Sequence, residues 1–270
     1  MSFLKTQEKP LQIVGVINAY CAILAEKSGF EALYLSGAGV ANASYGIPDI
    51  GLTTLNQVLI DIERITQVTS LPLLVDADTG FEDITQTVQS IEAAGAAGLH
   101  LEDQIEQKRC GQLDGKQLVK TQEMVERIQK ATCARENKNF MIMARTDAIT
   151  VEGLEAAVLR AKAYQDAGAD AIFVEAALRL EDYGLFKQAL DIPILANITE
   201  FGKTPLFSVE ELKQVNVDMI LYPLSAFRAM NQAALAVYQT IKKQGTQREC
   251  LGDMQTREQL YEYLNYDAKK

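Results

Sequence analysis

Eight short apolar runs, separated by segments with helical spacing, restrict the fold more than any other feature of the chain. The runs are residues 12–17, 32–37, 71–78, 98–103, 140–147, 171–176, 193–199 and 219–225. Each run is rich in Val, Ile, Leu or Met and is bounded by turn or capping residues, which is typical of strands buried on both faces. Between the runs, apolar residues recur at helical spacing, as Ile84, Val88 and Ile91 do.

Strands that alternate with helices favour a parallel sheet covered by helices. A doubly wound open sheet and a closed (β/α)8 barrel of the TIM type both fit this order. Eight near-regular units and the absence of a glycine-rich dinucleotide fingerprint favour the barrel. A chain of 270 residues is usual for one such barrel. We therefore expect a single α/β barrel domain over 1–270, in which 230–270 forms a C-terminal helical extension.

A weak internal repeat sets the register of the strands. Four expected helices end at Gly or Asn, which tolerate the left-handed backbone that stops a helix: Gly29, Gly95, Gly168 and Asn216. The fifth residues after these caps are Tyr34, His100, Phe173 and Leu221, and the seventh are Ser36, Glu102, Glu175 and Pro223. Because positions two apart on a strand share a face, the fifth residues should form a floor beneath the seventh.

Polar side chains also gather where other strands end. Asp76 and Asp78 close one run, Arg145 and Asp147 another, and Asn197 and Thr199 a third. A single polar strand end simply marks where a strand meets water. Five such ends on one shared face instead indicate a site, because barrels of this type carry their sites at the C-terminal ends of the strands.

The residue types at these ends predict a metal and an anionic ligand. Asp76, Asp78 and Glu102 should converge, with Asp49 near them, and close carboxylates cannot all stay ionised without a counter-charge. Mg²⁺ suits such a set, because it takes one or two carboxylates together with waters and substrate oxygens; Mn²⁺ is an alternative. Arginine forks bind carboxylates, so the expected substrate is a small tricarboxylate or similar polycarboxylate that chelates the metal.

The absence of lysine from the eight runs argues against a Schiff-base aldolase. A metal-dependent carbon–carbon lyase would polarise a substrate oxygen through the cation and would need an acid to protonate the carbanion. Cys110, in the segment KRCGQLDGK (108–116), is the candidate acid. Lys108 and Arg109 favour its thiolate, and Gly111 and Gly115 give the loop freedom to close over the site.

Composition excludes other classes. The formal net charge of −10 disfavours a nucleic-acid binder, which needs a basic face. No apolar run reaches the roughly 18 residues of a membrane helix, and the first residues lack a signal-peptide pattern, so we expect no membrane and a cytoplasmic location. The four cysteines have no metal-ligand spacing. The single histidine, His100, is expected inside the barrel, hydrogen-bonded near Glu102.

Several segments together resemble the isocitrate lyase and phosphoenolpyruvate mutase superfamily, over nearly the whole chain. They are LYLSGAGVA (33–41), LPLLVDAD (71–78), AGLHLEDQ (97–104), KRCG (108–111), MARTDA (143–148), LANITEFGKTPLF (195–207), LYPLSAFRAMN (221–231) and MQTREQLY (254–261). KRCG preceded by LHLEDQ is specific in combination, whereas KRCG alone would be a weak signal.

The resemblance implies a role for each matching residue. Cys110 would be the catalytic acid/base, Asp76 and Asp78 would hold Mg²⁺, and Asp49 and Glu102 would lie near the ion through water. The implied substrate-binding residues are Ser36, Gly37, Ala38, Gly111, Arg145, Glu175, Asn197, Ile198, Thr199, Arg228 and Arg257. The family also implies a homotetramer in which neighbouring subunits exchange C-terminal helices.

Within the superfamily, the chain looks like the members that cleave 2-methylisocitrate to pyruvate and succinate by a retro-aldol reaction. Isocitrate-specific members tend to carry Trp and Thr where this chain has Phe173 and Leu221, so the expected floor has room for a methyl group. Isocitrate lyase, oxaloacetate hydrolase and dimethylmalate lyase remain alternatives. Outside enzymes, the alternative is a dicarboxylate-binding barrel with a redox-sensitive thiol. Tyr34, Asp49 and a metal-bound water all remain candidates for the base.

Three positions depart from the family pattern. Gln112 stands where the cysteine loop usually has His, and Gln cannot titrate near neutrality. Ala38 stands where Gly is common in the substrate loop. The segment after Asp78 is shorter than usual.

Overall fold

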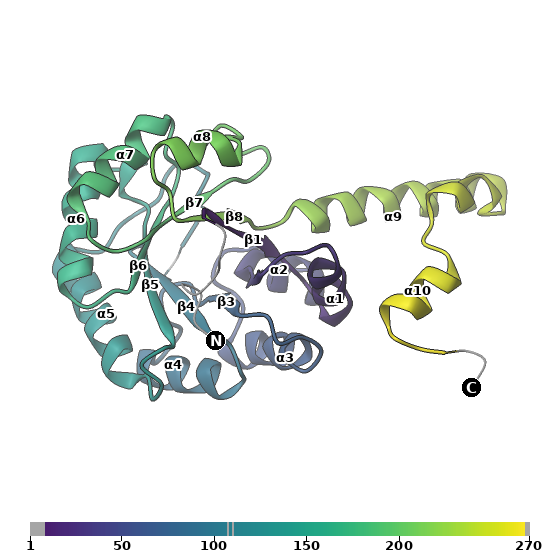
Figure 1. Cartoon of the computed structure of the whole chain (residues 1–270), viewed down its shortest axis with the longest axis horizontal. Coiled ribbons are helices and arrows are strands. Elements are labelled where there is room, and N and C mark those ends of the chain that lie inside the picture. The colour runs from purple at the N-terminus through teal and green to yellow at the C-terminus, as the bar shows by residue number, and fades with distance from the viewer. Residues whose placement is uncertain (1–8, 107, 110, 268–270) are drawn as a thin grey trace.

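The centre of the molecule is a closed barrel of parallel strands (Figure 1), seen in a computed structural model that describes residues 9–106, 108–109 and 111–267. The strands follow one another in chain order, and β8 closes the ring by pairing with β1. They are β1 (Leu11–Gly15), β2 (Ala32–Leu35), β3 (Leu73–Asp76), β4 (Gly98–Glu102), β5 (Met141–Thr146), β6 (Ala171–Val174), β7 (Ile194–Asn197) and β8 (Met219–Tyr222). Each apolar run overlaps one strand, so the predicted (β/α)8 barrel is confirmed.

Helices connect the strands and cover the outside of the barrel (Figure 1). The main helices are α1 (Ala19–Lys27), α3 (Leu55–Thr66), α4 (Ile84–Ala93), α5 (Thr121–Ala134), α6 (Leu154–Asp166), α7 (Leu180–Ala189), α8 (Val209–Gln214) and α9 (Ser225–Gln244). Shorter elements are α2 (Gly37–Gly39), the π-helical η2 (Val40–Ser44), the 3-10 turns η3 (Ala148–Thr150) and η4 (Arg248–Asp253), and α10 (Arg257–Tyr263).

The four expected caps stop their helices in the left-handed region, as the sequence predicts. The φ angles are +90° at Gly29, +93° at Gly95, +103° at Gly168 and +58° at Asn216. Ordinary side chains rarely adopt this conformation, so Gly and Asn at these points end the helix and turn the chain into the next strand. The same caps therefore fix the distance from helix end to strand, and with it the register of each strand.

The strands separate two apolar clusters. Alternate residues of β5, such as Ile142 and Ala144, pack outward against the helices, whereas Met141 and Met143 point into the barrel. The inner cluster consists of Leu11, Ile13, Ala32, Tyr34, Leu74, Met141, Met143, Ala171, Phe173, Leu195, Met219 and Leu221. The barrel interior is therefore a packed core, and ligands have access only where this apolar filling ends.

The C-terminal region departs from the barrel. Helix α9 extends away from it, and the chain then turns back through η4, so that α10 contacts α1 (Figure 1). Every residue of α9 is partly or fully exposed in the single chain, including Met230, Leu235, Tyr238 and Ile241. An amphipathic helix that exposes large apolar side chains in this way lacks the packing surface that normally stabilises it.

Among the residues described, no helix has both the length and the apolar character needed to cross a bilayer.

Candidate active site

A cavity of about 230 Å³ lies where the barrel strands end. Its wall takes residues from the ends of β2 to β8 and from the loops that follow them. The predicted site residues that line it are Tyr34, Ser36, Ala38, Asp49, Asp76, Glu102, Gly111, Arg145, Phe173, Glu175, Asn197, Thr199, Leu221 and Arg228. The structure thus gathers most of the residues chosen from sequence around one space.

Tyr34, Phe173 and Leu221 form the apolar bottom of this cavity. All three belong to the inner cluster and are at most 2% exposed. Ser36, Glu102, Glu175 and Pro223 line the cavity as well, two residues further along the same strands.

His100 completes the same layer, but its partner differs from the expected one. Its Nε2 lies 2.9 Å from the Tyr34 hydroxyl and 3.5 Å from Asp76 Oδ1. The expectation of a hydrogen bond near Glu102 was wrong, because the parallel register places His100 directly opposite Asp76. Burial lowers the pKa of His100 to about 4, so the imidazole is neutral at physiological pH.

Asp76 and Asp78 face the same small space beside Gly37. A Cβ on Gly37 would lie 3.1 Å from Asp76 Oδ2 and 3.2 Å from Asp78 Oδ1, so only a glycine leaves the gap between the two carboxylates open. The Gly37 N–H donates to Asp76 Oδ2 at 3.0 Å. Asp78 lies beyond the end of β3 in a left-handed conformation, with φ of +50°, whereas the apolar run had placed it on the strand.

The two carboxylates titrate differently. Burial would raise the pKa of Asp76, but His100, the cations of Lys108 and Arg145 and the Gly37 N–H together outweigh burial and hold that pKa below its usual range. Burial raises the pKa of Asp78 to about 7, with added repulsion from Asp76 and Asp49 and opposition from Lys108. The contrast shows that the neighbouring groups offset burial fully at Asp76 but only in part at Asp78.

Lys108 binds the carboxylates directly. Its ammonium lies 2.7 Å from Asp49 Oδ1 and forms a second, shorter ion pair with Asp78 Oδ1. The side chain is 5% exposed, and although burial opposes its charge, the surrounding carboxylates raise the pKa of Lys108 well above its usual value. The sequence had suggested this lysine only as a neighbour of the thiol. Cys110, the predicted catalytic residue, lies outside the described residues.

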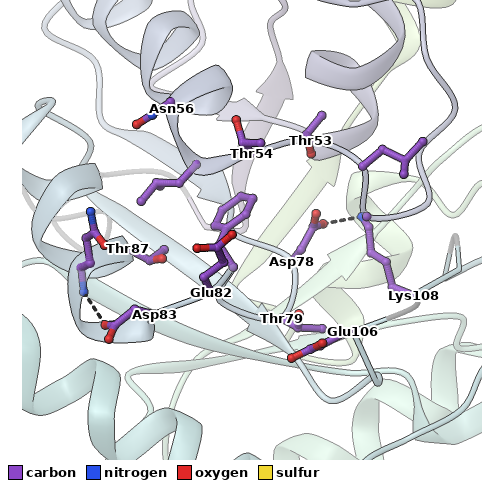
Figure 2. Close-up of a pocket in the computed structure, with 15 residues that line it drawn as sticks. Thr53, Thr54, Asn56, Asp78, Thr79, Glu82, Asp83, Thr87, Glu106 and Lys108 are labelled. Carbon is purple, nitrogen blue, oxygen red and sulfur yellow. Dashed lines mark hydrogen bonds and ion pairs between the residues drawn. The ribbon is translucent and has the colours of Figure 1, made fainter.

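A second cavity, of about 530 Å³, lies on the other side of this lysine (Figure 2). Lys108 lines both cavities, and Figure 2 shows its contact with Asp78, which lines the second one. The shortened segment after Asp78 supplies Thr79, Phe81 and Glu82 to its wall. Although larger, this cavity has no arginine in its wall, so we place the chemistry in the smaller one.

The acidic side of the site has the donors that Mg²⁺ prefers. No group of three or more His, Cys, Asp or Glu residues stands ready to enclose a metal among the described residues. Mg²⁺ needs no such cage, since it commonly takes one or two carboxylates and completes its shell with water and substrate. The open gap at Gly37 and the buried Glu102 Oε1, which has no hydrogen-bond partner, fit that mode.

Arg145 supplies the cationic side. Its guanidinium forms a double contact with Asp147, at 3.0 Å and 3.1 Å, and lies 3.3 Å from Glu102. It also lies over the Phe173 ring, 5.3 Å from the centroid. Lys116 approaches Asp147 from the cysteine loop at 2.9 Å. Asp147 therefore orients Arg145, a role that sequence reasoning missed although the residue had been noted at the strand end.

Two side-chain amides hold Glu175. Asn197 Nδ2 donates to Glu175 Oε2 at 3.0 Å, and Gln112 Nε2 donates to Glu175 Oε1 at 2.5 Å. A side chain at Gly111 would collide with Arg145 and Glu175, so glycine there allows the loop to approach. Burial raises the pKa of Glu175, and Arg145 opposes that shift.

Four of the predicted site residues that the structure describes do not line this cavity. Asp78 lines the second cavity instead. Gly37 lies between the two aspartates, as described above. Ile198 is buried in the outer apolar cluster behind β7. Arg257 begins α10, which contacts α1 on the outside of the barrel in the single chain (Figure 1).

Comparison with known proteins identifies the family. A protein-family model described as phosphoenolpyruvate phosphomutase matches residues 1–242. The chain belongs to this family. A curated 2-methylisocitrate lyase of Shewanella oneidensis is 59% identical over 263 residues, which cover 96% of this chain and 90% of that protein.

Solved structures of the superfamily share the fold. A crystal structure of 2,3-dimethylmalate lyase superposes with a TM-score of 0.87 at 33% identity and covers 94% of this chain and 86% of that one. Phosphonopyruvate hydrolase in complex with oxalate and Mg²⁺ superposes with a TM-score of 0.82 at 28% identity, over 94% of this chain and 90% of that one. Members of the superfamily therefore catalyse several reactions, and the choice among them for this chain rests on the residues of its site.

Proposed function

We propose that this protein is a Mg²⁺-dependent carbon–carbon lyase that cleaves 2-methylisocitrate to pyruvate and succinate, as in the methylcitrate cycle of propionate breakdown. One observation carries the proposal. A single cavity places the carboxylates Asp76 and Glu102 opposite Arg145, above a floor formed by Phe173 and Leu221. That arrangement suits a methyl-bearing tricarboxylate, and the relatives named 2-methylisocitrate lyase support the assignment.

Asp76 and Asp78 would hold the metal, and Asp49 and Glu102 would reach it through water. When bound, Mg²⁺ supplies Lewis-acid stabilisation of negative charge on substrate oxygens. Mn²⁺ accepts a similar oxygen set. The superfamily structure with oxalate and Mg²⁺ supports the choice of ion.

The remaining residues would bind and orient the substrate. Arg145 and Arg228 offer forks for substrate carboxylates. The other contacts would come from Ser36, Gly37, Ala38, Gly111, Glu175, Asn197, Ile198, Thr199 and Arg257. The apolar floor would receive the methyl group, which discriminates against isocitrate by about 1–3 kcal/mol.

The chemistry balances with one base and one acid. The base removes the proton from the C2 hydroxyl, the C2–C3 bond breaks, and the electron pair remains on the carbon that becomes succinate. The Cys110 thiol then protonates that carbon, and its thiolate is tolerated because Lys108 and Arg109 are adjacent in sequence. Pyruvate and succinate result with no net change in protons.

The test is an assay of pyruvate release by the purified protein. We expect faster cleavage of 2-methylisocitrate than of isocitrate, and loss of turnover in excess chelator. Faster cleavage of isocitrate would make the protein an isocitrate lyase. Cys110→Ser should abolish turnover but retain Mg²⁺ and product binding; a protein that only binds dicarboxylates would release no pyruvate before or after this substitution.

We further propose a homotetramer in which neighbouring subunits exchange C-terminal helices. The exposed apolar side chains of α9 support this, since another subunit would cover them. Exchange would also bring Arg257 to the site of a neighbour. Light scattering on the purified protein should give four times the 29.8 kDa mass of the chain; a monomeric mass would contradict the proposal.

A further inference from the structure

Gln112, one of the departures from the family pattern, joins the cysteine loop to two other parts of the site. It follows Gly111 in the loop between β4 and α5. Its Nε2 donates to Glu175 Oε1 at 2.5 Å, at the end of β6. Its Oε1 accepts from the backbone N–H of Lys203 at 2.7 Å and of Thr204 at 3.5 Å, in the loop after β7.

The orientation of this amide follows from its partners. A backbone N–H can only donate, so the side of Gln112 that faces Lys203 must be its carbonyl oxygen. The NH₂ group then necessarily faces Glu175, whose carboxylate oxygens accept. Residue 112 must therefore accept on one side and donate on the other at the same time.

The loop after β7 is shaped for this side chain. A Cβ on Gly202 would lie 2.6 Å from Gln112 Oε1 and 2.9 Å from its Cδ. Contacts this short do not occur in folded proteins, so a larger residue at 202 would displace the amide. The lack of a side chain at Gly202 thus leaves the space that the Gln112 amide occupies.

Glu175 depends on this contact for its direction. Asn197 fixes one carboxylate oxygen from the β7 side, and Gln112 fixes the other from the cysteine loop. With both amides in place, the carboxylate cannot rotate about its last torsion without breaking a hydrogen bond. Arg145 lies nearby, as the crowding at Gly111 shows, and would attract a released carboxylate.

We propose that Gln112 is a positioning residue, which holds Glu175 in its substrate-facing orientation and ties the loop after β7 to the cysteine loop. This inference rests on the proposed lyase function. It assigns to glutamine a donor and an acceptor that are both present at every pH, because the amide does not titrate. A histidine could replace it only as the neutral tautomer, since protonation removes the acceptor that Lys203 needs.

Two substitutions separate the two contacts. Gln112→Glu keeps the acceptor for Lys203 but replaces the donor to Glu175 by a like charge. Gln112→Met has similar length and removes both. At pH 8, both should lower kcat/KM on 2-methylisocitrate, by about 100-fold for Gln112→Glu. Hydrogen exchange at the Lys203 amide should accelerate about two- to tenfold in Gln112→Met alone.

A third variant supplies the pH readout. The kcat/KM of Gln112→His, divided by that of the wild type, should rise with pH as the imidazole loses its proton. The charged groups around that imidazole are Glu175, Arg145, Asp147, Lys116, Asp114, Lys203 and Glu200. Gly202→Ala serves as the matched control, because it should accelerate Lys203 exchange while residue 112 stays Gln.

Unchanged Lys203 exchange in Gln112→Met, or a kcat/KM of Gln112→Glu within threefold of the wild type, would overturn the inference. Exchange requires no turnover, so it is independent of the proposed reaction. If the wild type releases no pyruvate, the lyase function fails. Calorimetric binding of succinate with Mg²⁺, compared between wild type and Gln112→Glu, then decides the positioning role.

Discussion

Two neighbouring carboxylates, Glu102 and Asp103, lie on opposite sides of the barrel wall and differ in their hydrogen-bond partners. They are consecutive in the chain and no more than 1% exposed. Glu102 ends β4 and faces the cavity, whereas Asp103 points outward beneath α6. Burial raises the pKa of both side chains, so the difference between them lies in their partners.

Asp103 is fully satisfied. Its Oδ2 accepts from the hydroxyls of Thr146 at 2.8 Å and Tyr164 at 2.9 Å, and its Oδ1 accepts from the Asp147 N–H at 2.9 Å. Arg160 lies 3.8 Å from the same carboxylate. Such a network joins β4, β5 and α6, and it resembles the satisfied polar groups that normally occur in protein interiors.

Glu102 is only half satisfied. Its Oε2 lies 3.3 Å from Arg145, and its buried Oε1 has no hydrogen-bond partner. Leaving a buried carboxylate oxygen unpaired costs free energy, which the outward network avoids. The outward Asp103 is therefore satisfied and stabilises the fold, whereas the inward Glu102 keeps, among the described residues, an unpaired oxygen at the cavity, where a ligand or its water would complete it.

The largest expected effect is on stability. Asp103→Ala leaves two hydroxyls, one backbone N–H and Arg160 without their shared acceptor, so the free energy of unfolding should fall by about 3–5 kcal/mol. Denaturant unfolding measures it. Asp103→Asn, which keeps the shape and one acceptor, should lose less. Equal stability of Asp103→Ala and the wild type would contradict the role of Asp103 in stabilising the fold.

The second effect concerns turnover. Glu102→Gln keeps the volume and removes the charge, so kcat/KM on 2-methylisocitrate should fall by about 100-fold through lost electrostatic stabilisation. The free energy of unfolding should change by no more than about 1 kcal/mol, since the glutamine carbonyl oxygen can still accept from Arg145 in place of Oε2 and Oε1 has no partner to lose. A stable Glu102→Gln variant with wild-type kcat/KM would contradict the role of Glu102 in turnover.

The sequence predicted the barrel and most of the cavity wall because both follow from local rules. Helix caps such as Gly95 and Gly168 set the strand register, and two-residue periodicity then placed Glu102 above His100 and Glu175 above Phe173. These steps need no knowledge of long-range contacts.

Contacts between loops could not be predicted in this way. The Lys108 ammonium reaches Asp49 and Asp78, and Gln112 reaches Lys203, across loops whose path no periodicity sets. The partner of His100 was also missed, because its choice between Asp76 and Glu102 depends on the stagger between strands. That stagger is a property of the closed barrel and is not encoded within one strand.

A third effect tests the floor beneath Glu102. Phe173→Trp combined with Leu221→Thr fills part of the apolar floor and adds a hydroxyl, matching the pattern of isocitrate-specific members. The ratio of kcat/KM for 2-methylisocitrate over isocitrate should fall about tenfold or more, because one methyl group is worth about 1–3 kcal/mol. Steady-state kinetics on both substrates measures this ratio. An unchanged ratio would mean that the methyl group lies elsewhere.

The smallest effect comes from two buried tyrosines on opposite faces of the barrel wall. Tyr164 donates to Asp103 and accepts from Arg160 at 3.2 Å, so Tyr164→Phe should cost about 1 kcal/mol of stability and leave kcat/KM within twofold. Tyr34 bonds His100 and lies 3.3 Å from Asp76 in the cavity. Its matched variant, Tyr34→Phe, should instead lower kcat/KM.

Thermal unfolding measures the stability of both variants, and steady-state kinetics measures their kcat/KM. Each substitution removes one tyrosine hydroxyl and leaves a buried ring in place. The two variants can therefore be compared without a difference in hydrophobic burial. If Tyr164→Phe lost activity and Tyr34→Phe lost only stability, the division between an inward functional face and an outward structural face would be wrong. If both lost activity, the outward network would itself have to orient Arg145, since Asp103 binds the backbone of the Asp147 that holds that guanidinium.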